Sequence, residues 1–160
     1  MISFNADEIF EIAEQIERNG AKFYRKAAAG AARKSAPVLL KLAEMEDEHK
    51  KTFHEMRRRL GTKEQQPTTF DPEGQAAAYL RAMAEGKVFD VKADPSAKLT
   101  GKESVRDILE TAIGLEKDSI VFYVGMKDLV PAGLGRDRID EIIRQEMGHI
   151  TTLSGELSAC

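Results

Sequence analysis

The amino-acid sequence predicts an all-α fold in which four long helices form two helical hairpins and pack as an up-down bundle. Four long stretches place apolar side chains at the spacing of a buried helix face, and clusters of Gly and Pro separate them. The composition agrees, with few aromatic residues and no Trp. Because 160 residues suit one domain with a full core, we expect residues 1–160 to form a single domain.

Helix-start signals define the first predicted hairpin. Asn5 and Glu8 have the spacing of a capping box, which predicts that the first helix begins directly after Asn5. Ser35 is the expected N-cap of the second helix, because Pro37 follows in its first turn. The expected helices are about 6–29 and about 36–60, and together they form a hairpin over about 6–60.

A long crossover, about residues 61–100, is expected to join the two hairpins. Its first part is polar and twice broken by proline. Asp71 is the expected cap of an extra short helix that opens at Pro72 and ends near Gly86, and residues 87–99 are expected to be irregular. Such a crossover lets the second pair of helices begin at the proper end of the bundle.

The second hairpin is predicted from similar signals. Thr100 and Glu103 form another capping-box pattern, and Pro131 and Gly135 interrupt the chain before the last helix. The expected helices are about 101–129 and about 135–157, in a hairpin over about 101–157. The apolar face of the third long helix is expected to contain Val105, Leu109, Ala112, Ile113, Ile120, Tyr123 and Val124.

A repeated motif carries the chemistry. Two strings place a carboxylate and an imidazole three residues apart: Glu46-Asp-Glu-His49 and Glu146-Met-Gly-His149. In a helix both side chains then leave the same face, one turn apart, and can bind one ion. Each of the other two long helices has a Glu followed seven residues later by a Tyr: Glu17 with Tyr24, and Glu116 with Tyr123. A lone Glu from two helices and Glu-x-x-His from two others is the ligand set of carboxylate-bridged di-iron bundles.

These four glutamates lie within the apolar stripes of their helices. Glu116, for example, shares its helix face with Ala112 and Ile120. Four facing carboxylates would each cost several kcal/mol to desolvate, so either they are protonated and strained or cations lie between them. Carboxylate and imidazole donors favour two iron or manganese ions, whereas structural zinc sites more often have thiolates. The predicted metal ligands are Glu17, Glu46, His49, Glu116, Glu146 and His149.

Two interpretations are open for Tyr24 and Tyr123. Each could simply pack in the bundle with one partner for its hydroxyl. Alternatively, each hydroxyl donates to a ligating carboxylate, which fixes the carboxylate and makes the tyrosine a catalytic source of a proton or an electron. The third histidine, His54, has no acidic residue three positions before it and is expected at the rim.

Charge and cysteine content exclude several classes of protein. A net charge of -3, from 24 basic and 27 acidic residues, implies no basic face, so we expect no nucleic-acid partner. The uncharged stretches are too short to span a membrane, and the first residues lack the pattern of a secretory signal, so we expect no membrane partner. Cys160 is the single cysteine, which excludes an internal disulfide and a four-cysteine metal site and fits a cytoplasmic location.

The doubled motif resembles the ferritin-like superfamily, and the rubrerythrin branch in particular. The resemblance covers the two hairpins and not the crossover. It implies a di-iron centre in which Glu46 and Glu146 bridge or cap two irons, with manganese or zinc as substitutes. It also implies that Glu17 and Glu116 are terminal ligands and that each ion has one histidine. For the activity it implies reduction of hydrogen peroxide, or dioxygen, in defence against oxidative stress. Short chains of this kind commonly pair, so a homodimer is expected.

The sequence departs from that family in two ways. A full-length rubrerythrin has a four-cysteine iron site that supplies electrons, so this chain would need an external electron donor such as a rubredoxin-type protein. Rubrerythrins also carry an additional Glu where this chain has Ser119. The remaining set of four Glu and two His also resembles the ferroxidase centre of bacterioferritin. A ferroxidase or iron-handling protein is therefore one alternative function, and a structural metal-binding bundle is another.

Overall fold

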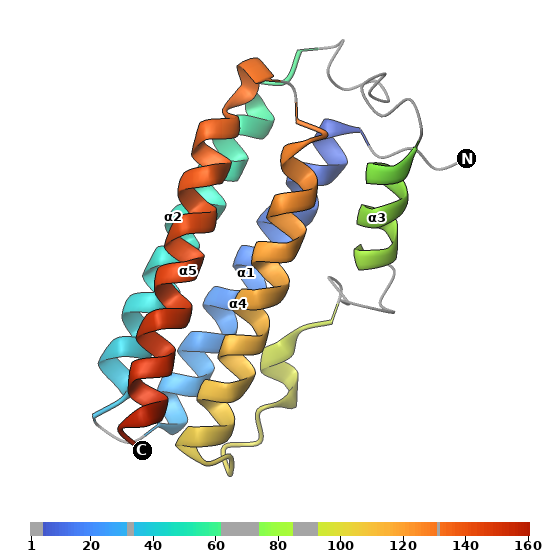
Figure 1. Cartoon of the computed structure of the whole chain (residues 1–160). Coiled ribbons are helices and arrows are strands. Elements are labelled where there is room, and N and C mark those ends of the chain that lie inside the picture. The colour runs from blue at the N-terminus through green and yellow to red at the C-terminus, as the bar shows by residue number, and fades with distance from the viewer. Residues whose placement is uncertain (1–4, 32–33, 62–73, 85–92, 131) are drawn as a thin grey trace.

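A computed structural model describes residues 5–31, 34–61, 74–84, 93–130 and 132–160. Four long helices lie side by side as a bundle (Figure 1). The two helices of each hairpin run antiparallel, whereas the second and third long helices, which the crossover joins, run in the same direction. They are α1 (Ala6–Gly30), α2 (Ala36–Arg58), α4 (Val105–Lys127) and α5 (Arg136–Ser158). The described residues contain no strand, and the predicted all-α bundle of two hairpins is confirmed. None of the described helices is long and apolar enough to cross a membrane.

The first hairpin begins as predicted. The backbone N–H of Glu8 donates to Asn5 Oδ1 at 2.8 Å, and the Asn5 N–H donates to Glu8 Oε2 at 3.1 Å, so both bonds of the capping box are present. Ser35 occupies the N-cap position of α2, but its side chain makes no capping hydrogen bond. Pro in the first turn has no N–H, so α2 has fewer donors for a cap to satisfy.

The predicted start of α4 is wrong by four residues. The N-cap is Ser104, which forms a capping box with Asp107, and the helix begins at Val105. Glu103 does accept a hydrogen bond from the Thr100 N–H, at 2.6 Å, as the sequence pattern suggested. That bond closes a turn around Gly101, whose φ of +82° cannot belong to a right-handed helix.

The described part of the crossover contains two short elements. Helix α3 (Gln75–Ala84) falls within the predicted short helix, while the expected cap at Asp71 and the end near Gly86 lie outside the described residues. Residues 87–99 were expected to be irregular, but η1 (Pro95–Lys98) forms one 3₁₀ turn. Its N-cap is Asp94, whose side chain accepts a hydrogen bond from the Ser96 N–H at 2.9 Å. A second 3₁₀ turn, η2 (Ala132–Leu134), precedes α5.

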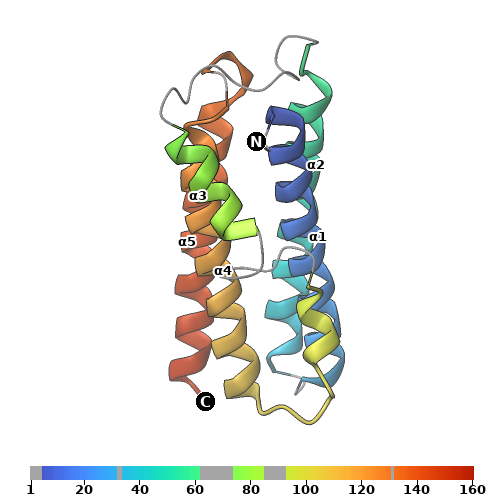
Figure 2. The ribbon, with the colours of Figure 1, turned by 90° about the vertical axis from the view of Figure 1, so that its right-hand side faces the viewer.

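The η1 segment is attached to α1, as Figure 2 shows. Lys26 Nζ donates to the carbonyl of Ser96 at 2.9 Å, and Asn19 Nδ2 donates to the carbonyl of Ala93 at 3.3 Å. An ion pair between Lys22 and Asp94 joins the same two elements. The crossover therefore returns along the outer face of the first helix before α4 begins.

The apolar core consists of two clusters, one on each side of the middle of the bundle. One cluster surrounds Phe53, whose ring lies 6.4 Å from that of Phe10 and 5.1 Å from that of Tyr123. The other includes Tyr24 and Leu109. The predicted inward position of Val124 is wrong, since 49% of it is exposed, because it lies about 100° round α4 from the buried Tyr123.

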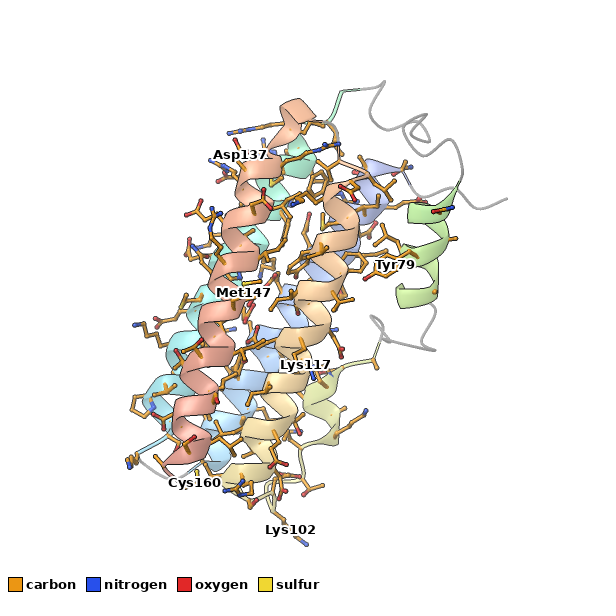
Figure 3. All side chains as sticks on the ribbon, in the orientation of Figure 1. Tyr79, Lys102, Lys117, Asp137, Met147 and Cys160 are labelled. Atoms are coloured by element: carbon orange, nitrogen blue, oxygen red, sulfur yellow. The ribbon has the colours of Figure 1, made fainter. Side chains whose placement is uncertain are left out.

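Helix α3 is held on α4 by one aromatic side chain (Figure 3). Tyr79 Oη donates to the carbonyl of Val121 at 2.8 Å, and its ring lies over Gly125. A Cβ at Gly125 would be 2.2 Å from Tyr79 Cε1, so only glycine allows this close contact. The buried Leu80, 0% exposed, joins the core cluster around Phe53.

We expect Gly125→Ala to detach α3, because the Tyr79 ring must move and its hydrogen bond to Val121 is lost. Limited proteolysis should then cleave the crossover faster than in the wild type, while circular dichroism shows the four long helices intact. Gly114→Ala is the matched control, since a Cβ there meets nothing within 4 Å, and it should raise stability by about 0.5–1 kcal/mol. Equal cleavage rates in the two variants would contradict the role assigned to Gly125.

Candidate metal centre

The six predicted ligands come together between the two apolar clusters, at the middle of the bundle. The Glu-x-x-His spacing places a carboxylate and an imidazole one turn apart on the inner face of α2, and again on α5. The lone glutamates come from α1 and α4. All six are buried, with exposed fractions of 1% for Glu17, 4% for Glu46, 3% for His49, 3% for Glu116, 0% for Glu146 and 2% for His149.

The six residues form two overlapping groups that could each hold a metal ion. One group is Glu17, Glu46, His49 and Glu146, and the other is Glu46, Glu116, Glu146 and His149. Within each group, one donor atom from every residue lies within 4.8 Å of all the others. Glu46 and Glu146 belong to both groups, so the centre has two halves that share two carboxylates.

The shared carboxylates turn one oxygen toward each half. Nδ1 of His49 lies 3.1 Å from Glu146 Oε1, and Nδ1 of His149 lies 2.8 Å from Glu146 Oε2. Glu46 is arranged in the same way: its Oε2 lies 3.6 Å from His49 Nδ1, and its Oε1 lies 3.4 Å from His149 Nδ1. A carboxylate that offers its two oxygens to two sites is placed to bridge two ions.

The unshared carboxylates complete one half each. Glu17 Oε2 lies 3.5 Å from His49 Nδ1, and Glu116 Oε1 lies 3.4 Å from His149 Nδ1. The two imidazole rings face each other with centroids 5.6 Å apart and planes inclined by 17°. Each half of the centre therefore has the same kinds of ligand, as the repeat in the sequence predicts.

Several donor atoms of this centre lack a hydrogen-bond partner among the described residues. They are Glu17 Oε2, His49 Nδ1, both oxygens of Glu146 and His149 Nδ1. Buried polar atoms are normally paired, so an inward-facing group without partners fits the binding of cations. The donors are carboxylate oxygens and imidazole nitrogens, which suit iron.

Each of the two tyrosines forms a hydrogen bond with the lone glutamate of the other hairpin. Tyr24 Oη donates to Glu116, and Tyr123 Oη donates to Glu17. Neither reaches the glutamate on its own helix, because seven residues correspond to about 10 Å along the axis. The structure thus supplies the hydrogen bonds that the second interpretation of these tyrosines requires. A catalytic role for them stays a prediction.

Comparison with known proteins agrees with this geometry. Residues 8–157 match the model of the family described as Rubrerythrin. The chain belongs to the rubrerythrin family. A structural match is a protein from Thermotoga maritima described as a ferritin-like diiron-carboxylate protein, at 23% identity and a TM-score of 0.79. The match covers 99% of this chain and 97% of the other, and it confirms the ferritin-like fold. No curated protein matches the sequence.

Burial and mutual repulsion determine the protonation of this rubrerythrin-family centre. Burial raises the pKa of Glu17 well above its ordinary value, and the charges of Glu46 and Glu146 raise it further. The same causes raise the pKa of Glu116. Burial acts in the same direction on Glu46 and Glu146, but neighbouring groups, including the imidazoles of both histidines, outweigh it and lower the pKa of these two carboxyls.

The histidines respond in the opposite way. Burial alone would lower the pKa of His149, but the neighbouring carboxylates of Glu116, Glu146 and Glu46 outweigh it and raise the pKa to about 12. The carboxylates of Glu146, Glu17 and Glu46 likewise outweigh burial and raise the pKa of His49. Two imidazolium ions then balance two ionised carboxylates. Two divalent cations with four carboxylates and two neutral imidazoles give the same zero net charge, so metal and protons can exchange without burying net charge.

A cavity of about 250 Å³ adjoins the centre between α1, α4 and the crossover. Glu46 and Glu116 form part of its wall, and Ala93 and Pro95 of the crossover form another part. Gly20 and Ser119 both line it, and each lies three residues after a lone glutamate of the repeat. This cavity was not predicted from the sequence, although the paired small residues at equivalent positions of the repeat were a signal for it.

Two polar contacts beside the centre were not predicted from the sequence either. Gln145 Oε1 lies 2.6 Å from His49 Nε2, on the side of the ring that faces away from the carboxylates. Glu14 is buried, 3.4 Å from His54 Nδ1. His54 itself has 58% of its side chain exposed and belongs to neither metal-binding group, as expected of a rim residue.

We expect metal binding to release protons from Glu17, Glu116, His49 and His149, because metal ligands must be deprotonated. The pKa values of these groups are raised without metal, so apparent metal affinity should increase with pH. Calorimetric titration of Co²⁺ in two buffers of different ionisation enthalpy measures the protons released.

His54→Ala is the control for this measurement, because His54 is exposed and lies outside both groups. It should release as many protons as the wild type. Metal binding with no proton release would contradict the protonation assigned to the centre.

Proposed function

We propose that this chain is a non-haem di-iron oxidoreductase that reduces hydrogen peroxide to water with electrons from an external donor. The observation that carries the proposal is the pair of overlapping groups that share Glu46 and Glu146. Membership of the rubrerythrin family supports di-iron chemistry in general. Peroxide as the oxidant rests on the resemblance to that family and on the tests below.

In this proposal each half of the centre would hold one ion. Glu17 and His49 would be ligands of the first, Glu116 and His149 would be ligands of the second, and the carboxylates of Glu46 and Glu146 would be available to both. Manganese or zinc could replace iron with the same ligands. When bound, two ferrous ions supply the two electrons that one peroxide molecule needs.

The chain's own residues position the ligands and the protons. Reduction of one H₂O₂ to two H₂O takes two electrons and two protons. Tyr24 and Tyr123 hold protons at Oη and donate hydrogen bonds to Glu116 and Glu17, which fixes the orientation of those carboxylates. Burial and the neighbouring glutamates raise the pKa of both phenols, so both remain protonated at neutral pH. They are therefore the proposed proton sources nearest the reaction.

The cavity beside Glu46 and Glu116 is the proposed route for a small oxidant, since it adjoins both carboxylates. The apolar clusters on either side of the centre keep bulk water from the other inner faces. The 160 residues contain one cysteine and so hold no four-cysteine iron site of their own, and the proposal therefore takes the electrons from an external donor. A rubredoxin-type donor, a homodimeric state and a cytoplasmic location stay predictions.

Ferroxidase activity is the second candidate. The specific observation in its favour is Ser119, which leaves the centre with four glutamates and two histidines. With that set, dioxygen would be the oxidant and iron the cargo.

The two functions are distinguished by the oxidant. Anaerobic protein loaded with two ferrous ions per chain is mixed in a stopped-flow instrument with one equivalent of either oxidant. We expect peroxide to oxidise both irons much faster than dioxygen does, and a supplied reductant to sustain peroxide consumption. Faster oxidation by dioxygen, with iron uptake far beyond two ions per chain, would favour the ferroxidase. Failure to bind iron would favour the remaining alternative, a structural metal-binding bundle.

Access through the cavity gives a separate prediction. Ser119→Leu adds bulk inside the cavity, and we expect the rate of peroxide reduction to fall about tenfold, equal to about 1.4 kcal/mol of barrier. Metal content should stay at two ions per chain, because Ser119 Oγ donates to the Leu115 carbonyl and Ser119 belongs to neither metal-binding group.

Ser154→Leu, at an exposed position of α5, is the matched control and should leave the rate unchanged. Equal rates for Ser119→Leu and Ser154→Leu would exclude this cavity as the oxidant's route.

A further inference from the structure

The two halves of the centre differ on the outer side of their histidine rings. His49 Nε2 donates to Gln145 Oε1 at 2.6 Å. His149 Nε2 is buried and has no hydrogen-bond partner among the described residues. Around the ion-facing nitrogens the halves are alike, since each has one unshared glutamate, two shared glutamates and one crossing tyrosine. The supporting hydrogen bond is therefore the main chemical difference between the two ligand sets.

The sequence repeat explains this asymmetry. Gln145 directly precedes Glu146, and from α5 it reaches the histidine of α2. The equivalent residue before Glu46 is Met45, on α2. A thioether sulfur is at best a weak hydrogen-bond acceptor, so Met45 cannot do for His149 what Gln145 does for His49.

An imidazole that binds an ion through Nδ1 must carry its proton on Nε2. An acceptor at Nε2 stabilises that tautomer, fixes the plane of the ring and makes Nδ1 a better ligand. Loss of such a partner typically lowers metal affinity by about 10–100-fold. The ring of His149 lacks this support.

We propose that Gln145 is a positioning residue that makes the Glu17–His49 half the tighter of the two ion sites. The first ion binds in that half, and the Glu116–His149 half fills second and exchanges faster. This inference rests on the proposed dinuclear centre. Cavities do not separate the halves, because one cavity borders Glu46 and Glu116 and another, of about 330 Å³, is lined by His49 and Gln145. The inference therefore depends on the hydrogen bond of Gln145 to His49 and on the lack of such a bond at His149 within the described part of the chain.

Titration of the metal-free protein with Co²⁺, followed by its visible absorption, tests the proposal without any turnover. We expect two ions per chain in two steps. Because the shared carboxylates couple the ions, the steps alone do not identify the halves, and variants must do so. Gln145→Leu should weaken the tighter step by about 10–100-fold, whereas Gln145→Glu keeps an acceptor and should preserve it. Met45→Gln gives His149 an acceptor and should tighten the weaker step.

Each result decides the question. Unchanged constants in Gln145→Leu, or a loss confined to the weaker step, would overturn the role of Gln145. Circular dichroism checks that this variant folds, and Gln145→Glu with Met45→Gln decides the matter if it does not. Binding of fewer than two Co²⁺ ions by the wild type would instead overturn the dinuclear centre on which the inference rests.

Discussion

Four glutamates buried at the middle of a helical bundle are the constraint on which the rest of this structure depends. Each ionised carboxylate would cost several kcal/mol to remove from water, and all four repel one another. Two histidines and two tyrosine hydroxyls lie beside these carboxylates and offset this cost, and the six predicted ligands are arranged so that they could hold two cations. The apolar clusters on either side stabilise the helices, so the centre itself can remain polar.

An internal repeat produces this centre, and departures from the repeat make its halves different. The shared pattern places a lone glutamate on the first helix of each hairpin and Glu-x-x-His on the second. Gln145 has no polar counterpart, because Met45 stands at the equivalent position. The crossover adds a second asymmetry, since its attachment to α1 forms part of the wall of the cavity beside Glu46 and Glu116. The repeat thus supplies the ligands, while the departure at Gln145 supplies an order of binding.

Much of the fold and of the site was predictable from the sequence, because both depend on helical periodicity. The long helices appear within a few residues of their expected bounds, and the six predicted ligands are all buried and adjacent. The start of α4 was not predictable, because Thr100 with Glu103 and Ser104 with Asp107 are both valid capping patterns. Only the positive φ of Gly101 separates them.

Contacts between helices could not be read from spacing along one helix. The pairing of each tyrosine with the glutamate of the opposite hairpin depends on the relative height of α1 and α4. The contact between Gln145 and His49 likewise depends on how α5 faces α2. That residues 1–160 form a single domain stays a prediction.

A crystal structure of the iron-loaded protein, with anomalous scattering recorded at the iron edge, would show directly whether the centre holds two ions. We expect two peaks about 3.5–4 Å apart, which is the usual separation in two-metal sites. Glu46 and Glu146 should lie between the peaks, with His49 on one ion and His149 on the other. A single peak, or iron bound outside these six residues, would contradict the central claim.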